Sequence, residues 1–255
     1  MSSSAPIGVY DSGLGGLTVW RAIRDRLPLE SIVYLGDGLN CPYGSRSCEE
    51  IIGYADRAVG ELLAVGCKII VVACNTATAV AIDYLRAKYR EVNIVGMEPA
   101  VKPACLQSKS GVVGVIATER SLEGGLFQRT AARYSDNVRV IARFGRGFVE
   151  LVERGMESSP EAEEIVREVV DEMIVEGVDQ IVLGCTHYPF LIPVLERVAP
   201  NVNIIDPSQA VARRVEQLLQ VEGLLKCDDI GVEYDFRTFS SNEYREALRS
   251  RALSM

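Results

Sequence analysis

Paired cysteines and long apolar runs are missing from this chain of 255 residues. Its seven cysteines, at positions 41, 48, 67, 74, 105, 185 and 227, are odd in number and contain no C-x-x-C pair, so neither a disulfide framework nor a standard zinc motif fits. The longest apolar runs, such as Ile69–Ala73, are far too short to cross a bilayer, and the opening "MSSSAPIG" lacks the basic and apolar regions of a signal peptide. We therefore expect a cytoplasmic protein with reduced thiols.

An excess of positive charge is also absent. The formal net charge is −8 and the pI is about 4.9, whereas nucleic acids and anionic membranes require a basic surface on their partner. We expect no nucleic acid and no membrane as a partner. If the ligand is an anion, backbone N–H groups must hold it.

What the chain does contain is a regular alternation of short β-branched segments with helical patterns, which is typical of parallel α/β units. The expected strands are Ile7–Tyr10, Ser31–Leu35, Lys68–Ala73, Asn93–Met97, Gly111–Ala117, Val138–Ala142, Gln180–Leu183 and Val202–Ile205. Helix starts are predicted at the capping box "SCEE" (Ser47–Glu50) and at Ser159-Pro160 and Asp206-Pro207.

Two prolines in Met97–Cys105 interrupt this rhythm and predict a crossing into a second domain. A second crossing near Asp206 would return the chain to the first domain, with one more candidate strand in "VEYDFRTF". We expect two similar α/β domains with mainly parallel sheets. Residues 1–97 plus 207–255 form the first and residues 98–206 the second, so each domain holds one of the two cysteines considered next.

Cys74 and Cys185 each follow a β-branched segment directly, in "VVACNTAT" and "IVLGCTHYP". The carboxyl ends of strands in open α/β sheets are where ligands and catalytic groups collect. A single free cysteine is more often a small buried hydrophobe. Here both are followed by polar groups that packing does not need, Asn75-Thr76 and Thr186-His187, and we therefore interpret the pair as functional.

His187 is the only histidine in the chain and lies two residues after Cys185, so it is well placed to exchange a proton with a thiol. Taken alone, it is equally well interpreted as a satisfied core or surface residue. A metal site made of Cys67, Cys74, Cys185 and His187 would match no standard zinc spacing.

Two glycine-containing turns follow the first two expected strands. In "GVYDSGLGGLTVW", Asp11 precedes glycines that let the backbone approach a ligand, but Thr18 stands where a dinucleotide-binding fingerprint needs glycine. In "GDGLNCPYGSRS", Tyr43 and Gly44 reach the same sheet edge. The structural alternatives are a turn-capping aspartate and an ordinary tight turn with an exposed tyrosine.

The motifs "DSGLGGL", "DGLNCPYGSRS", "ACNTATA" and "LGCTHYPFL" together resemble the cofactor-independent glutamate racemases within the aspartate/glutamate racemase superfamily, over nearly the whole chain. The resemblance implies two α/β domains with the active site in the cleft between them, no cofactor and no metal, glutamate as substrate, and D-glutamate supply for peptidoglycan. A second copy of the chain is a candidate partner in a homodimer.

Carried over by motif, Cys74 and Cys185 are the two catalytic acid/bases, and Asp11, His187 and Glu153 assist them. The substrate-binding residues implied in the same way are Asp11, Ser12, Pro42, Tyr43, Gly44, Asn75, Thr76, Ser121, Thr186 and His187. The chain departs from the family pattern in "RFGRGFVELVE" (Arg143–Glu153) and at Ser121 and Gly124.

Independently of the resemblance, the chemistry of racemisation is suited to two thiols. Inverting an α-carbon removes a hydrogen from one face and returns one to the other, and one base cannot easily reach both. Three other interpretations stay open: an aspartate racemase or decarboxylase of the same superfamily, a hydrolase with a cysteine nucleophile, and a binding protein with a vestigial site.

Overall fold

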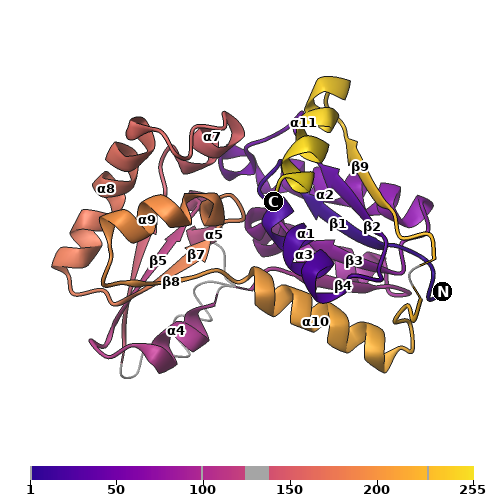
Figure 1. The fold of residues 1–255 in the computed structure, drawn as a ribbon, viewed down its shortest axis with the longest axis horizontal. Coiled ribbons are helices and arrows are strands. Elements are labelled where there is room, and N and C mark those ends of the chain that lie inside the picture. Colours follow the sequence, from indigo (N-terminus) through magenta and orange to yellow (C-terminus); the bar gives the residue numbers. More distant parts are fainter. Residues whose placement is uncertain (1, 99, 124–137, 229) are drawn as a thin grey trace. The chain divides into compact units, whose positions relative to one another are not determined.

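Two compact units make up the chain: Met1–Met97 with Ser208–Met255, and Glu98–Pro207. The structure is a computed structural model, and it describes residues 2–98, 100–123, 138–228 and 230–255. Both units have α/β architecture with a parallel sheet (Figure 1). The sequence prediction placed the first crossing at the same residue and the second one residue earlier, after residue 206.

The first unit is built on five parallel strands in the order β4-β3-β1-β2-β9. Their bounds are β1 Ile7–Asp11, β2 Ile32–Gly36, β3 Ile69–Val72, β4 Asn93–Gly96 and β9 Tyr234–Thr238. The predicted strands are confirmed with ends that differ by one or two residues, and the late segment "VEYDFRTF" does join this sheet, beside β2.

Helices cover both faces of this sheet because side chains alternate between the faces along each strand. The α2 and α3 helices (Cys48–Ala64 and Asn75–Lys88) pack on the face that holds Tyr10, Ile70 and Val72. The other layer is formed by α1 (Leu17–Arg26) and α10 (Ser208–Val221), while α11 (Asn242–Leu253) packs beside β9. The short η1 helix, Tyr43–Ser45, lies in the loop after β2.

The second unit repeats this plan with four parallel strands in the order β6-β5-β7-β8. The strands are β5 Val112–Ala117, β6 Arg139–Phe144, β7 Gln180–Gly184 and β8 Asn203–Ile205. The helical elements are α4 Val101–Gln107, α5 Glu119–Glu123, α7 Phe148–Glu153, α8 Pro160–Val175, η2 Tyr188–Leu191 and α9 Ile192–Val198. One face of the sheet packs on α4, and on the other Gly114 lies close against Met173 of α8.

Both sheets reverse their winding direction at an equivalent place. After β1 the chain adds β2 on one side and then returns to add β3 on the other, and β5, β6 and β7 do the same. Such switch points leave a crevice at the carboxyl ends of the two central strands, where α/β proteins bind ligands. The β1/β3 and β5/β7 pairs are therefore the places where each unit is expected to hold its functional groups.

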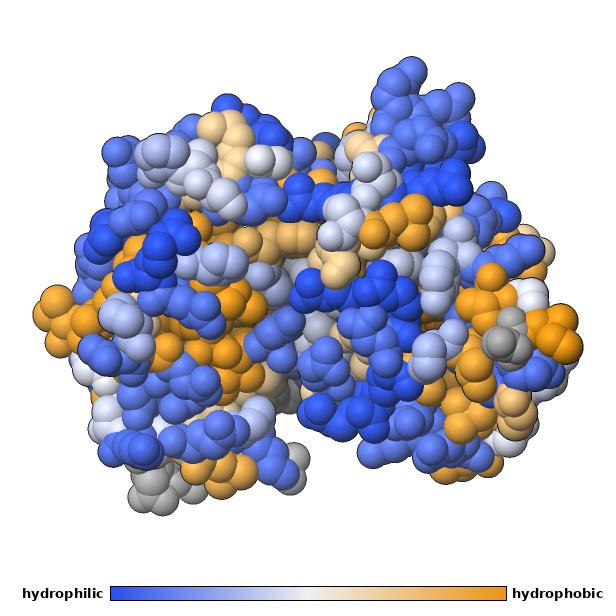
Figure 2. Space-filling model, viewed as in Figure 1, coloured by the Kyte–Doolittle hydropathy of each residue, from blue (hydrophilic) through white to orange (hydrophobic). Residues whose placement is uncertain are grey.

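The predicted helix starts are confirmed. Ser47 and Glu50 form both bonds of a capping box, and the Ser159 side chain accepts a hydrogen bond from the Ala162 N–H at 3.1 Å; α10 begins at Ser208, directly after Pro207. Within the described ranges, no helix has the length and apolarity needed to span a membrane. Hydrophilic and apolar residues are interspersed on the face shown in Figure 2.

Candidate active site

Asp11 and Cys74 lie at the switch point of the first sheet. Asp11 is the last residue of β1, and Cys74 follows the neighbouring strand β3 by two residues. Both side chains are buried. The Asp11 carboxylate accepts a hydrogen bond from the Gly13 N–H at 2.9 Å, which holds the glycine turn after β1 in place.

Cys74 is the N-cap residue of α3, and its sulfur caps the helix. The Sγ atom accepts the Ala77 N–H at 3.4 Å, and the thiol lies 3.5 Å from the hydroxyl of Ser12. The N-terminus of a helix carries a partial positive charge, and N–H donors directed at sulfur favour the thiolate over the thiol. The helix N-terminus and the Ala77 N–H are therefore placed to stabilise a thiolate when Cys74 gives up its proton.

Asn75 and Thr76 form the first turn of this helix and are buried beside the cysteine. Within the described residues, the Oδ1 atom of Asn75 is buried without a hydrogen-bond donor. Buried acceptors are nearly always paired in folded proteins. An acceptor left open next to Cys74 is suited to a ligand that brings its own donor, such as an ammonium group.

Tyr43 is fixed by a buried chain of hydrogen bonds. The Tyr10 hydroxyl donates to Tyr43 at 2.7 Å, and Tyr43 donates to the Asp37 carboxylate at 2.6 Å. Burial, above all, raises the pKa of both tyrosines, so both remain protonated donors. The prediction of a loop reaching the sheet edge is confirmed, but Tyr43 is buried where an exposed tyrosine was the alternative. Of its two neighbours, Pro42 is exposed and Gly44 is half-buried.

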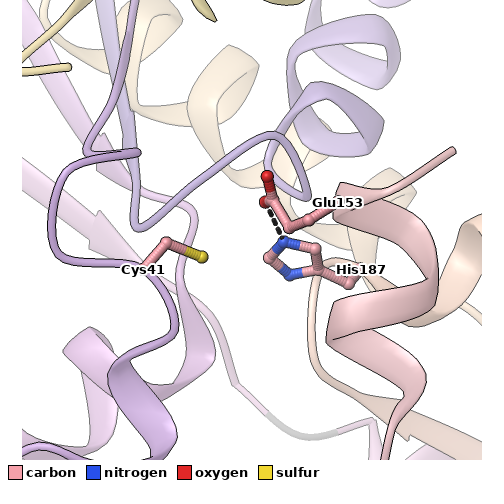
Figure 3. Close-up of side chains that lie close together, drawn as sticks. All are labelled: Cys41, Glu153 and His187. Atoms are coloured by element: carbon pink, nitrogen blue, oxygen red, sulfur yellow. Dashed lines mark hydrogen bonds and ion pairs between the residues drawn. The ribbon is translucent and has the colours of Figure 1, made fainter.

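Cys185, His187 and Glu153 form a line of contacts in the second unit. The Cys185 Sγ lies 3.7 Å from His187 Nδ1. On the other side of the ring, His187 Nε2 lies 2.7 Å from an Oε atom of Glu153, and Figure 3 shows this second contact. An ionised carboxylate can only accept, so Nε2 carries the hydrogen. When the imidazole is neutral, the lone pair of Nδ1 therefore faces the thiol. This arrangement can take a proton from Cys185 and return it.

Glu153 is the last residue of α7, and it is this carboxylate, rather than the one at Glu150, that contacts His187. The helix begins after Gly147, whose φ of 79° favours glycine. Arg143, in the segment that departs from the family pattern, forms ion pairs with Glu172 and Glu176 near the end of α8. Its side chain thus joins β6 to α8.

Ser121 lies at the switch point of the second sheet together with Thr118, a residue that the sequence analysis missed. The Thr118 hydroxyl donates to Ser121 at 2.8 Å, and both are buried. Thr118 directly follows β5, and Ala117 at the end of β5 pairs with Gly184, the residue before Cys185. The sequence signal that could have identified Thr118 is its position directly after a β-branched segment, the same signal that singled out Cys74 and Cys185. Thr186 is also buried here, whereas Gly124 lies outside the described residues.

Cys67 is unsuited to a metal site shared with Cys74. The two cysteines lie at opposite ends of β3, and at about 3.3 Å per residue their backbones are roughly 20 Å apart. Within either unit, the described residues include no group of three His, Cys, Asp or Glu side chains placed to share a metal ion.

Comparisons with known proteins converge on one enzyme class. Residues 18–215 match the family described as Asp/Glu/hydantoin racemase. The chain is 49% identical to the glutamate racemase of Herpetosiphon aurantiacus over 221 residues, which cover 86% of this chain and 87% of that protein.

Solved structures agree. The glutamate racemase of Francisella tularensis in complex with D-glutamate superposes with a TM-score of 0.87 at 28% identity, covering 99% of this chain and 95% of that one. The Escherichia coli glutamate racemase in complex with L-glutamate and the activator UDP-MurNAc-Ala gives 0.86 at 28% identity, covering 97% and 95%.

Proposed function

Because this chain belongs to the Asp/Glu/hydantoin racemase family, we propose that it interconverts L- and D-glutamate with Cys74 and Cys185 as the two acid/bases. The observation that carries the proposal is that each unit places one cysteine at the switch point of its own sheet. Relatives with this fold have been solved with D-glutamate in one case and L-glutamate in another.

The reaction requires one thiolate and one thiol at the same time. The thiolate removes the α-hydrogen from one face of glutamate, the thiol delivers a hydrogen to the other face, and the two exchange roles in the reverse direction. A free cysteine has a pKa of about 8.5, so each needs local help to become a thiolate near neutral pH.

The two cysteines receive that help from different groups. Cys74 has the N-terminus of α3 and the Ala77 N–H, with Asp11 on the adjacent strand β1. Cys185 has the His187 imidazole, which Glu153 holds in one tautomer. Two chemically different helpers predict that the two directions of the reaction respond differently to substitutions.

Glutamate offers two carboxylates and one ammonium group to the binding residues. The open Oδ1 of Asn75 and the carboxylate of Asp11 suit the ammonium group. The carboxylates call for N–H and O–H donors, which the first turn of α3 and the hydroxyls of Ser12, Ser121 and Thr186 supply. Fixed donors of this kind also stabilise the charge that develops when the α-hydrogen leaves.

A cysteine hydrolase deserves a direct test, because a Cys-His-Glu line also activates nucleophiles. A hydrolase would need only the Cys185 half of the residues described above. The open acceptor and capped thiol around Cys74 favour the racemase instead. A hydrolase would give a burst of covalent acyl-enzyme, which a racemase does not form.

The biological setting follows from the substrate. D-glutamate is a building block of peptidoglycan, and we place the reaction in its synthesis, in the cytoplasm. The homodimer stays a prediction.

The proposed function is tested with purified protein and no added pyridoxal cofactor. The circular dichroism of L-glutamate and of D-glutamate should decay to zero, while L- and D-aspartate serve as the comparison pair. Persistent signals from both glutamate enantiomers would refute the proposal, and faster decay with aspartate would reassign the substrate.

A further inference from the structure

Three buried hydroxyls connect the chain crossings of the first unit to the turns that carry its candidate catalytic residues. The first belongs to Thr78, in the first turn of α3, four residues after Cys74. The Thr78 hydroxyl donates to the Val72 carbonyl at 3.1 Å and accepts the Met97 N–H at 3.0 Å. Met97 is the last residue before the chain leaves this unit.

This single hydroxyl therefore joins three segments. Val72 ends the strand that leads to Cys74, Thr78 belongs to the helix that Cys74 caps, and Met97 begins the crossing. The Thr78 N–H also donates to the Cys74 carbonyl at 2.9 Å, so the same residue fixes the backbone of the cysteine from the helix side. Gly96, next to Met97, packs closely against the Thr78 methyl group. A side chain at position 96 would place its Cβ only 2.7 Å from that methyl group.

The second crossing has an equivalent connection. Ser208 is the first residue after the chain returns to this unit, and its hydroxyl donates to Thr18 at 3.4 Å. The Thr18 hydroxyl in turn donates to the Gly15 carbonyl at 3.0 Å, within the glycine turn that follows Asp11. Ser208, Thr18 and Thr78 are all buried.

We propose that Thr78 and Thr18 are positioning residues for the racemase reaction, which couple the two crossing segments to the Cys74 and Asp11 turns. Neither side chain is assigned a contact with substrate. The inference rests on the proposed function, since it assumes that Cys74 acts as an acid/base. Its physical basis is that the Cys74 sulfur can use the Ala77 N–H only while the first turn of α3 keeps its place at the end of β3.

The test compares Thr78→Val, which keeps the side-chain shape and removes the hydroxyl, with Thr78→Ser, which keeps the hydroxyl. We expect the Val variant to lose kcat about ten-fold in both directions with KM changed less than about two-fold, and the Ser variant to recover most of the loss. Thr238→Val is the matched control, because the Thr238 hydroxyl accepts the Ser240 N–H on the exposed end of β9. It should keep wild-type kinetics.

A second readout does not depend on turnover. The rate at which iodoacetamide alkylates Cys74 in the native protein, followed by peptide mass spectrometry, should fall in Thr78→Val and recover in Thr78→Ser. A Val variant that is folded, less stable and yet unchanged in both kcat and Cys74 alkylation would overturn the proposal, because the hydroxyl would then serve stability alone.

Two further outcomes are separable. If the wild-type protein does not racemise glutamate, the proposed function fails, while the alkylation comparison still tests the positioning role. If Thr78→Val does not fold, Ser208→Ala removes the other connection at a smaller structural cost. It should lower kcat in the same way, and wild-type kcat in that variant would overturn the proposal.

Discussion

The Nε2 atom of His187 lies 2.7 Å from a carboxylate oxygen of Glu153, which leaves Nδ1 of the same ring facing the sulfur of Cys185. The histidine is buried, whereas the glutamate side chain is 19% exposed. The carboxylate can therefore fix the orientation of the buried imidazole from the edge of the site. The second candidate thiol thus has a complete proton relay within its own unit.

Replacing Glu153 by Gln should slow racemisation without changing the fold. A Gln side chain can donate as well as accept, so it no longer fixes the tautomer of His187, and we expect kcat to fall about ten-fold. The measurement is circular dichroism with each glutamate enantiomer. Glu150→Gln, one turn earlier on α7, is the control and should match the wild type. Equal rates in the two variants would contradict a role for Glu153.

Replacing His187 by Asn should affect the two directions unequally. In the proposed mechanism the imidazole assists Cys185, whereas the α3 N-terminus assists Cys74. We expect a loss of about 100-fold in the direction in which Cys185 must act as the base, and a smaller loss in the other. At equilibrium the two kcat/KM values must still balance, so the asymmetry is sought in kcat. Full activity in both directions would show that His187 is a bystander.

The cysteines should differ sharply in reactivity. Burial raises the pKa of the Cys67 thiol to about 12, so Cys67 stays protonated at neutral pH and should resist alkylation in the native protein. Cys48 and Cys227 are exposed and should react. Mass spectrometry after brief iodoacetamide treatment gives the order, and glutamate should protect Cys74 and Cys185 but neither Cys67 nor Cys227. Protection of Cys67 by substrate would contradict its place at the far end of β3.

Removing one partner of a buried ion pair should strongly destabilise the first unit. Lys68 Nζ lies 2.6 Å from Glu30 Oε2, both side chains are almost fully buried, and Lys68 also donates to the Leu224 carbonyl at 2.9 Å. Lys68→Ala leaves Glu30 buried without its partner, and should lower the free energy of unfolding by about 3–5 kcal/mol.

Lys88→Ala is the control for this substitution, since its pair with Asp56 is 43% and 26% exposed. Urea unfolding should show a much smaller loss of stability there, because solvent screens an exposed pair. Similar losses for the two variants would mean that burial does not set the cost of breaking the Lys68 pair.

Much of this fold could be predicted because its signals are local. Segments such as Ile69–Val72 are β-branched and bounded by turn residues, and the Ser47 and Ser159 caps lie within three residues of their partners. Cys74 and Cys185 could be singled out for the same reason, since each directly follows such a segment.

The contacts that escaped prediction join residues far apart in the chain. The Tyr10–Tyr43 bond spans 33 positions and the Thr18–Ser208 bond spans 190. Neither has a sequence signature, because strand order decides which loops meet. Thr118 directly follows a β-branched segment, which is a local signal, but only the β5–β7 pairing that brings Ala117 beside Gly184 shows that it lies near Cys185.

In a two-thiol mechanism, two different groups exchange the α-hydrogen with solvent, one on each face of the α-carbon. The most direct test starts from L-glutamate in deuterated water and stops at low conversion. We predict that the D-glutamate formed carries deuterium at its α-carbon while the remaining L-glutamate still carries hydrogen, and that Cys74→Ser and Cys185→Ser each abolish this conversion. D-glutamate that retains the original hydrogen, or full conversion by either serine variant, would contradict the two-thiol mechanism.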